Sequence, residues 1–289
     1  MIAALGFAFL LACVFGGFAL EGGSLIAVGR ALPFEMLTIG GAAIGSFAMA
    51  NSLHVMKASM GGLKKVFAGG RYHEDDYLDL LNLLYKLIRL INSKGAMAVE
   101  RHIDFPQESD IFLEHPKLLR NQEVLSIICD YFRMLGMNAD DPYQVEDLIG
   151  RELKKSLAEK MHPVHALQIM ADGLPALGIV AAVLGVIKTM THINERPAVL
   201  GEMIGGALTG TFLGVLLAYG LVGPLAARLK QLVEEEARFL EVIRATLIAH
   251  LHGNAPQLAI ETARKMVPSE AMPTFNSLET SLEQARVAR

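Results

Sequence analysis

Tryptophan is absent from this sequence of 289 residues, and only two cysteines occur, Cys13 and Cys129. Two cysteines cannot build a disulfide scaffold or a cysteine-based zinc site. The lack of tryptophan removes the residue that commonly marks the edges of membrane spans. Charged residues make up only 19% of the chain and the pI is near 6.1, which disfavours a nucleic-acid partner.

Motifs that carry catalysis are also missing. The sequence contains no glycine-rich phosphate loop, no dinucleotide fingerprint, no HExxH zinc motif and no G-x-S-x-G elbow. His162 and His165 have the i, i+3 spacing of a helical metal pair, but no cysteine or acidic cluster accompanies them. We therefore expect neither an enzyme nor a resident metal or cofactor.

Apolar residues make up 52% of the chain and are concentrated in blocks. A helix needs about 20 largely apolar residues to cross a bilayer. The blocks predict four spans, at about residues 2–20, 34–54, 168–190 and 203–227. Because the first block lacks the basic start of a signal peptide, we interpret it as an uncleaved span.

Lysine and arginine are distributed unevenly between these spans. Residues 57–165 contain fifteen and residues 228–289 contain eight, whereas residues 21–35 contain one and residues 188–202 contain two. Positive residues favour the cytoplasmic side of a membrane, so both termini are expected there. The predicted organisation is a transmembrane hairpin (1–56), a cytoplasmic helical domain (57–165), a second transmembrane hairpin (166–227) and C-terminal cytoplasmic helices (228–289).

The charged segments have helical periodicity and no hairpin signals. Residues Glu74–Asn92 carry apolar side chains on two faces, which predicts a largely buried helix. Further helices are expected over Asn121–Leu135, from Asp141-Pro142 toward Lys160, and over Leu229–His252. The predicted fold class is an all-α membrane protein with four transmembrane helices. A large helical cytoplasmic domain lies between spans 2 and 3, and a helical cytoplasmic tail follows span 4.

Small residues repeat at helical spacing in the last two spans. Gly206, Gly210 and Gly214 are four residues apart in the fourth span, and Gly178 lies in the third. Membrane helices use small residues where their backbones approach closely. We expect these glycines to pack against other chains as well as within this one.

Two prolines lie toward the cytoplasmic ends of the same spans, Pro175 and Pro224. Each removes a backbone donor and kinks or loosens a helix. Prolines can simply be tolerated at span ends. The functional interpretation is a pair of flexible points where membrane spans become cytoplasmic helices.

Acidic and basic side chains are missing from the middle of the predicted spans. Glu35, Asp172 and Glu202 lie at span margins. Because ion movement through lipid needs a titratable or polar group, the chain alone is expected to be a poor proton carrier. The carboxylate is therefore expected from a partner helix.

Several segments resemble the MotA family of flagellar motor stator proteins, in the MotA/TolQ/ExbB proton channel superfamily. They are FGGFALEGGSL (Phe15–Leu25), ERHIDFPQESDIF (Glu100–Phe112), DGLPALGIVAAVLGVI (Asp172–Ile187) and LTGTFLGVLLAYGLVGPLA (Leu208–Ala226). The resemblance implies a multi-pass inner-membrane protein that forms a homopentameric ring. The ring would surround a single-span, peptidoglycan-anchored partner, MotB, whose aspartate binds the proton, and would push the rotor switch protein FliG.

The resemblance also assigns residues of the ion pathway. Pro175 and Pro224 match the two functional prolines of the family. Thr211 matches the fourth-span threonine of sodium-driven relatives, but Ala182 stands where those relatives have a third-span threonine. Sodium needs several oxygen ligands, so the resemblance implies that the translocated ion is a proton.

The rotor contact is the third assignment. Glu100 matches the acidic member of the family's charged pair, whereas the position of the basic member is occupied by Asn92. Arg89, Lys94 or Arg101 could supply that positive charge, and the sequence does not choose between them.

Two alternatives stay open at this point. One is an energiser of outer-membrane processes similar to ExbB or TolQ, which have three spans. The N-terminal hairpin Met1–Met56 favours the flagellar type over this one. The other is a passive membrane scaffold with no role in ion movement.

Overall fold

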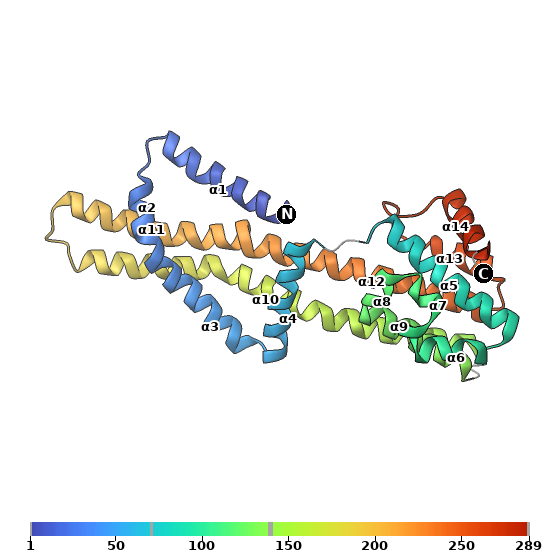
Figure 1. Cartoon of the computed structure of the whole chain (residues 1–289). Coiled ribbons are helices and arrows are strands. Elements are labelled where there is room, and N and C mark those ends of the chain that lie inside the picture. The colour runs from blue at the N-terminus through green and yellow to red at the C-terminus, as the bar shows by residue number, and fades with distance from the viewer. Residues whose placement is uncertain (1, 70–71, 138–140, 288–289) are drawn as a thin grey trace. The chain divides into compact units, whose positions relative to one another are not determined.

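The computed structural model describes residues 2–69, 72–137 and 141–287, and every regular element among them is a helix (Figure 1). Contacts divide the chain into two compact units, each built from two segments. The first unit comprises Met1–Gly70 and Glu159–Val233, and the second comprises Arg71–Ala158 and Glu234–Arg289.

The first unit begins with α1 (Ile2–Leu20) and a short loop in which Gly22 has a φ of +83°. Ser24 then caps the next helix, because its side chain accepts a hydrogen bond from the Ala27 amide. That helix runs through α2 (Leu25–Glu35), a π-helical turn η1 (Met36–Gly40) and α3 (Gly41–Ala50), and α4 (Leu53–Ala68) follows.

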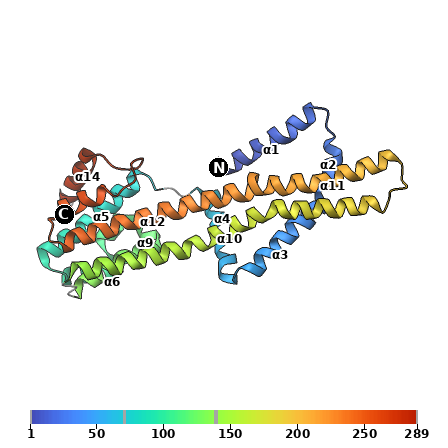
Figure 2. The ribbon, with the colours of Figure 1, turned by 180° about the vertical axis from the view of Figure 1, so that it is seen from behind.

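A long helical hairpin completes this unit. Its first arm consists of residues 159–190 of α10 (Pro142–Met190). Its second arm runs through α11 (Pro197–Leu217), the π-helical turn η3 (Ala218–Val222) and residues 223–233 of α12 (Gly223–Leu251). α10 and α11 lie side by side in both views (Figures 1 and 2). The core that joins them to the α2–α3 helix consists of Ile39, Ala43, Leu174, Ala181, Leu213 and Ala218.

The sequence predicted a helix ending near Lys160 and a separate span from about 168, but α10 is one helix of 49 residues. It continues through Pro163 and Pro175. Each proline removes one backbone hydrogen bond, and neighbouring helices commonly compensate for this loss in membrane proteins. Pro163 is buried, as are Val164, Ala166 and Leu167 directly after it, and their packing holds the helix continuous there.

Three helices are long and apolar enough to cross a membrane: Leu25–Ala50, Pro142–Met190 and Pro197–Leu251. Ala4–Leu20 is a shorter apolar helix. Most residues of the three apolar windows are not covered by the chain itself, since only 11%, 22% and 28% of each is buried. Membrane helices with such exposed apolar surface require lipid or other chains around them.

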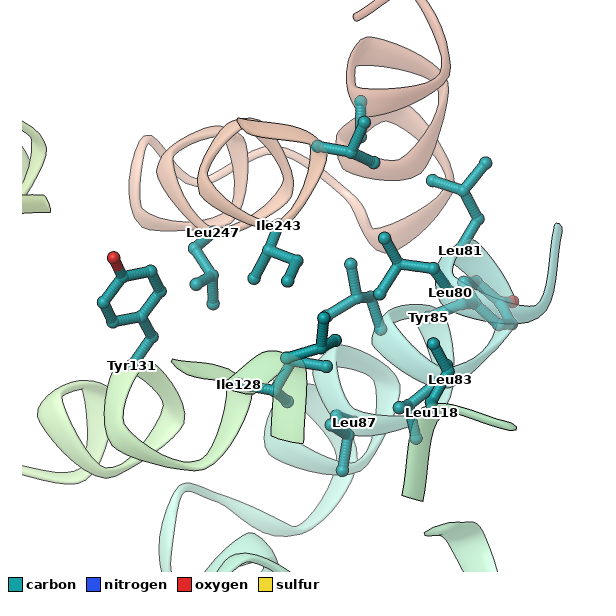
Figure 3. Close-up of a cluster of buried hydrophobic side chains, with 14 of the residues drawn as sticks. Leu80, Leu81, Leu83, Tyr85, Leu87, Leu118, Ile128, Tyr131, Ile243 and Leu247 are labelled. Carbon is teal, nitrogen blue, oxygen red and sulfur yellow. The ribbon is translucent and has the colours of Figure 1, made fainter. Parts of the chain in front are cut away.

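The second unit contains α5 (Glu74–Lys94), α6 (Met97–Asp104), η2 (Pro106–Glu108), α7 (Asp110–Leu113), α8 (Pro116–Arg120), α9 (Gln122–Gly136), α13 (Pro256–Arg264) and α14 (Phe275–Val287). Its core includes both faces of α5, as predicted, and Leu80, Leu83 and Leu87 are completely buried. Figure 3 shows these leucines in one buried cluster with Ile128 and Ile243, with Leu83 beside Leu118. Asn121 caps α9 through the Val124 amide.

A buried arginine ties the C-terminal helices together. The Arg264 guanidinium donates to both carboxylate oxygens of Glu261 and to the Pro273 carbonyl oxygen. The hydrogen bonds from Arg264 hold the pKa of the Glu261 carboxyl below its usual value of 4.5, although partial burial opposes this shift. Truncating either partner would leave buried polar atoms unsatisfied.

Candidate functional sites

Two glycines set the separation of α10 and α11. A Cβ atom on Gly178 would lie 2.9 Å from the Gly210 carbonyl oxygen and 3.1 Å from the Gly214 Cα. A Cβ on Gly214 would lie 2.7 Å from the Leu174 carbonyl oxygen. The glycines therefore allow direct backbone contact within this chain, which is the intramolecular packing expected of small membrane residues.

Gly206 has a different environment from the other three glycines of this set. Nothing lies within 4 Å of the position that its Cβ would take. The predicted packing of these glycines against other chains stays a prediction, since Gly178, Gly210 and Gly214 are already used inside the chain.

The two prolines have different local structures. Pro175 lies inside α10, one turn before Gly178, and the helix continues through it. Pro224 is the second residue of α12, and Gly223 separates it from the π-helical turn η3. At the end of that turn, the Gly223 amide donates to the Ala218 carbonyl oxygen. A proline cannot bond to the carbonyl four residues earlier and clashes with it. The helix is wider just before Pro224, in η3, whereas α10 continues through Pro175 as an α-helix. The role of the two prolines as flexible points stays a prediction.

Glu35 lies at a different place in its helix from the one that the sequence predicts. We expected it at a span margin, but α2, η1 and α3 form one apolar helix over Leu25–Ala50 and Glu35 lies inside it. Its Oε2 atom is buried without a hydrogen-bond partner among the described residues. A Cβ on Gly210 would lie 2.7 Å from that oxygen. The chain therefore places a carboxyl group of its own against α11.

Glu35 was predicted at the wrong place because the start of its helix was predicted too late in the sequence. Ser24 precedes an apolar run and is a recognisable N-cap, which places the start of the helix at Leu25, nine residues before the predicted span. The π-helical turn η1 begins three residues after Pro33, which lies inside α2. A proline in an apolar run is compatible with an uninterrupted helix, a kink or a π-helical turn, so the sequence did not predict this one.

The residues predicted to choose the ion lie near the same glycine contact. Thr211 belongs to α11, and its Cα would be 3.3 Å from a Cβ on Gly178. Ala182 lies one turn beyond Gly178 on α10, and both Thr211 and Ala182 are half-buried. The hydroxyl of neighbouring Thr209 donates to the Gly205 carbonyl oxygen at 3.0 Å and is already satisfied.

The predicted rotor-contact residues gather at one end of α5 and on α6. Arg89, Lys94, Glu100 and Arg101 are all exposed. α6 packs on α9 through a 2.9 Å ion pair between Asp104 and Arg133. None of the four predicted residues forms an ion pair with another residue in the described part of the chain, so their charges face solvent. The structure does not favour one cation over the others.

Comparisons with known proteins agree with this architecture. A family model for the motility protein A N-terminal region matches residues 4–95, and a model for the MotA/TolQ/ExbB proton channel family matches residues 113–242. The chain thus has the fold and the helices of a membrane-embedded member of the proton channel class. The match to the N-terminal model favours the flagellar branch over an ExbB or TolQ type.

Individual relatives identify the family to which the chain belongs within this class. Motility protein A of Salmonella typhimurium is 36% identical over 286 residues, covering 99% of this chain and 96% of the relative. Motility protein A of Escherichia coli is 38% identical over 279 residues, covering 96% and 94%. The chain belongs to the motility protein A family.

Solved structures show the same fold. The Campylobacter jejuni MotAB structure matches with a TM-score of 0.75 at 18% identity, covering 93% of this chain and 96% of that one. A chain of the flagellar MotAB stator complex from Bacillus subtilis matches with a TM-score of 0.71 at 20% identity, covering 94% and 98%.

Proposed function

We propose that this chain is the stator subunit of a bacterial flagellar motor, which with a MotB-like partner converts ion flow into torque on the rotor. The observation that carries this proposal is the family membership along nearly the whole chain. It is supported by the close packing of α10 on α11, which contain Pro175 and Thr211, and by Pro224 at the start of α12. The similar structures are complexes of two kinds of chain, which supports a second subunit here.

The exposed apolar faces of the hairpin support assembly. Ile179, Val183 and Ile187 on α10 are each more than half exposed. Between membrane helices, association comes from packing rather than from the hydrophobic effect, and such faces are available for it. A homopentameric ring of four-span subunits, with both termini in the cytoplasm of the inner membrane, would bury them against neighbours, the partner helix and lipid.

The proposed ion is the proton. Ala182 provides no oxygen ligand on α10, and sodium binding needs several oxygens, whereas a proton needs one carboxylate and water. Protonation of a partner carboxylate removes the cost of holding a charge in a low-dielectric site, which lets the ring move by one position. Glu35 is a second carboxyl group that this chain itself brings to the α10–α11 hairpin.

The exposed charges of α5 and α6 are the proposed contact with the rotor protein FliG. Reversing Glu100 to Lys should weaken torque, because a surface charge in a steered contact acts mainly through complementarity with its partner. A complementary reversal on the rotor should restore swimming. Swimming that is unchanged in the single variant would remove Glu100 from the contact.

A test of the whole proposal uses a motile host that lacks its own stator. Expression of this chain with its partner should restore swimming, and Pro175→Ala should abolish rotation while leaving the amount of protein in the membrane unchanged. Pro197→Ala is the matched control, because Pro197 is the exposed first residue of α11 and its substitution should leave swimming intact. A Pro175→Ala strain that swims normally would contradict the role of this proline.

A further inference from the structure

A groove of about 570 Å³ lies between α1, α2 and α11, in the part of the first unit remote from Pro175 and Pro224. Its wall on α1 consists of Val14, Phe15 and Phe18, and its wall on α11 includes the exposed face of Gly205 and Gly206. The rings of Phe15 and Phe212 meet edge to face, with centroids 5.9 Å apart, where the groove ends.

The groove is apolar although polar residues line part of it. The Thr209 hydroxyl is turned back to the Gly205 carbonyl oxygen. Inside the hydrocarbon zone of a membrane, water does not enter an apolar space, so the occupant has to be apolar. The choice lies between a lipid acyl chain and side chains of a neighbouring protein chain.

The length of the groove fits one lipid leaflet. Its lining on α11 runs from Gly201 to Phe212, which spans about 16 Å at the rise of an α-helix. The hydrocarbon core of a bilayer is about 30 Å thick, so one leaflet contributes about half of that. In the proposed topology, the loop before Gly201 faces outward and the groove lies in the outer leaflet.

A loose pair of opposite charges stands at the mouth of the groove. Glu202 lines the mouth, and its Oε1 accepts a long hydrogen bond of 3.4 Å from Nη1 of Arg30. Both side chains are well exposed, at 74% for Arg30 and 65% for Glu202. The arginine therefore keeps most of its donors available, and the carboxylate keeps its second oxygen available.

We propose that this groove binds one acyl chain of a zwitterionic phospholipid with a primary ammonium headgroup, phosphatidylethanolamine. The phosphate would accept hydrogen bonds from Arg30, as guanidinium groups favour. The ammonium would donate to Glu202. An anionic phosphatidylglycerol satisfies Arg30 but has no cation for Glu202, and the choline headgroup of phosphatidylcholine cannot donate a hydrogen bond.

The test counts lipid on the purified complex of this chain with its partner. After exchange into micelles containing equal amounts of phosphatidylethanolamine, phosphatidylglycerol and phosphatidylcholine, the lipids retained per chain are measured by mass spectrometry. We expect phosphatidylethanolamine to be retained about fivefold over the others, the scale of one exposed charged contact. Glu202→Gln should remove the preference for phosphatidylethanolamine over phosphatidylglycerol. Arg30→Gln should lower the retention of all three lipids, because each carries a phosphate.

Gly205→Leu tests the acyl-chain site. Nothing lies within 4 Å of a Cβ at Gly205, so leucine should enter the groove without a backbone clash and displace the lipid. Gly6→Leu is the matched control, since Gly6 is equally open but lies on α1 outside the groove, and its lipid retention should equal that of the unmodified complex.

Three results would overturn the proposal. The first is equal retention of the three lipids by the unmodified complex. The second is lipid retention in Gly205→Leu that is as high as in Gly6→Leu. The third is an unmodified complex that carries no lipid and that falls apart in Gly205→Leu, which would place a neighbouring chain in the groove. The proposal rests on the proposed function only for its leaflet assignment. The experiment measures bound lipid and not rotation of the motor. Failure of the lipid proposal can therefore be distinguished from failure of the proposed stator function.

Discussion

Single glycines determine how closely the α10–α11 hairpin packs. An added methyl group at Gly178 would meet the carbonyl oxygen of Gly210 at 2.9 Å, and backbone atoms cannot move aside as a side chain can. Gly178→Ala should therefore destabilise the first unit by about 1–3 kcal/mol, the usual cost of overpacking. The measurement is the thermal unfolding temperature of the purified complex.

Gly45→Ala is the control for this prediction, because nothing lies within 4 Å of its Cβ position in the chain. An equal loss of stability in both variants would show that the close backbone contact at Gly178 does not cause the destabilisation.

Arg264 gives a second prediction at the residue scale, this time in the second unit. Arg264→Met should lower the free energy of unfolding by about 3 kcal/mol, because it leaves Glu261 and the Pro273 carbonyl without their buried donor. Arg264→Lys, which keeps the charge, should lose less. Chemical unfolding of the second unit in the full chain measures both.

The same ion pair predicts a dependence on pH. Because the folded-state pKa of Glu261 lies below its usual value, its contribution is present at neutral pH and disappears as pH falls from about 4.5 through the folded pKa. The stability lost between pH 7 and pH 4 should be smaller in Arg264→Met than in the unmodified chain. An identical loss in both would mean that the pair does not couple folding to pH.

At the scale of helices, sequence patterns located most elements and failed at their junctions. The apolar stripe of α5 and the position of α9, expected over Asn121–Leu135 and found over Gln122–Gly136, follow from side-chain periodicity. The continuity of α10 could not be predicted, because prolines at 163 and 175 are compatible with either a break or an uninterrupted membrane helix. Burial of the Glu35 Oε2 atom depends on its contact with Gly210, which lies far away in the sequence, so no local pattern could predict it.

The π-helical turn before Pro224 yields the prediction at this scale. Replacing Pro224 by Ala restores the missing donor and removes the ring clash, so Ala218–Val222 should tighten toward ordinary α-helix. We expect slower rotation with normal membrane levels, because the wider turn between α11 and α12 is lost. Motor speed at low load measures the effect, and the Pro197→Ala variant again serves as the control. Unchanged speed would mean that the turn has no mechanical role.

At the scale of the whole chain, apolar and charged residues serve different purposes. Hydrophobic residues make up 52% of the sequence, and many of them lie in four apolar helical segments. The second unit instead buries a hydrophobic core of its own and carries exposed charges on α5 and α6. One charge crossing a potential of 100 mV releases about 2.3 kcal/mol, which is comparable with the cost of small rigid-body steps between packed helices. Family membership and this division of residues together support a device that is driven by ions and acts on a partner.

The most direct test of this account is the rotation speed of single motors in a host that contains only this chain and its partner as stator. The account predicts that expression restores rotation, that speed follows the proton-motive force, and that speed stays constant when external sodium is varied at fixed pH. Speed that rises and falls with sodium would contradict proton coupling. Motors that stay at rest while the complex is present in the membrane would contradict the stator function itself.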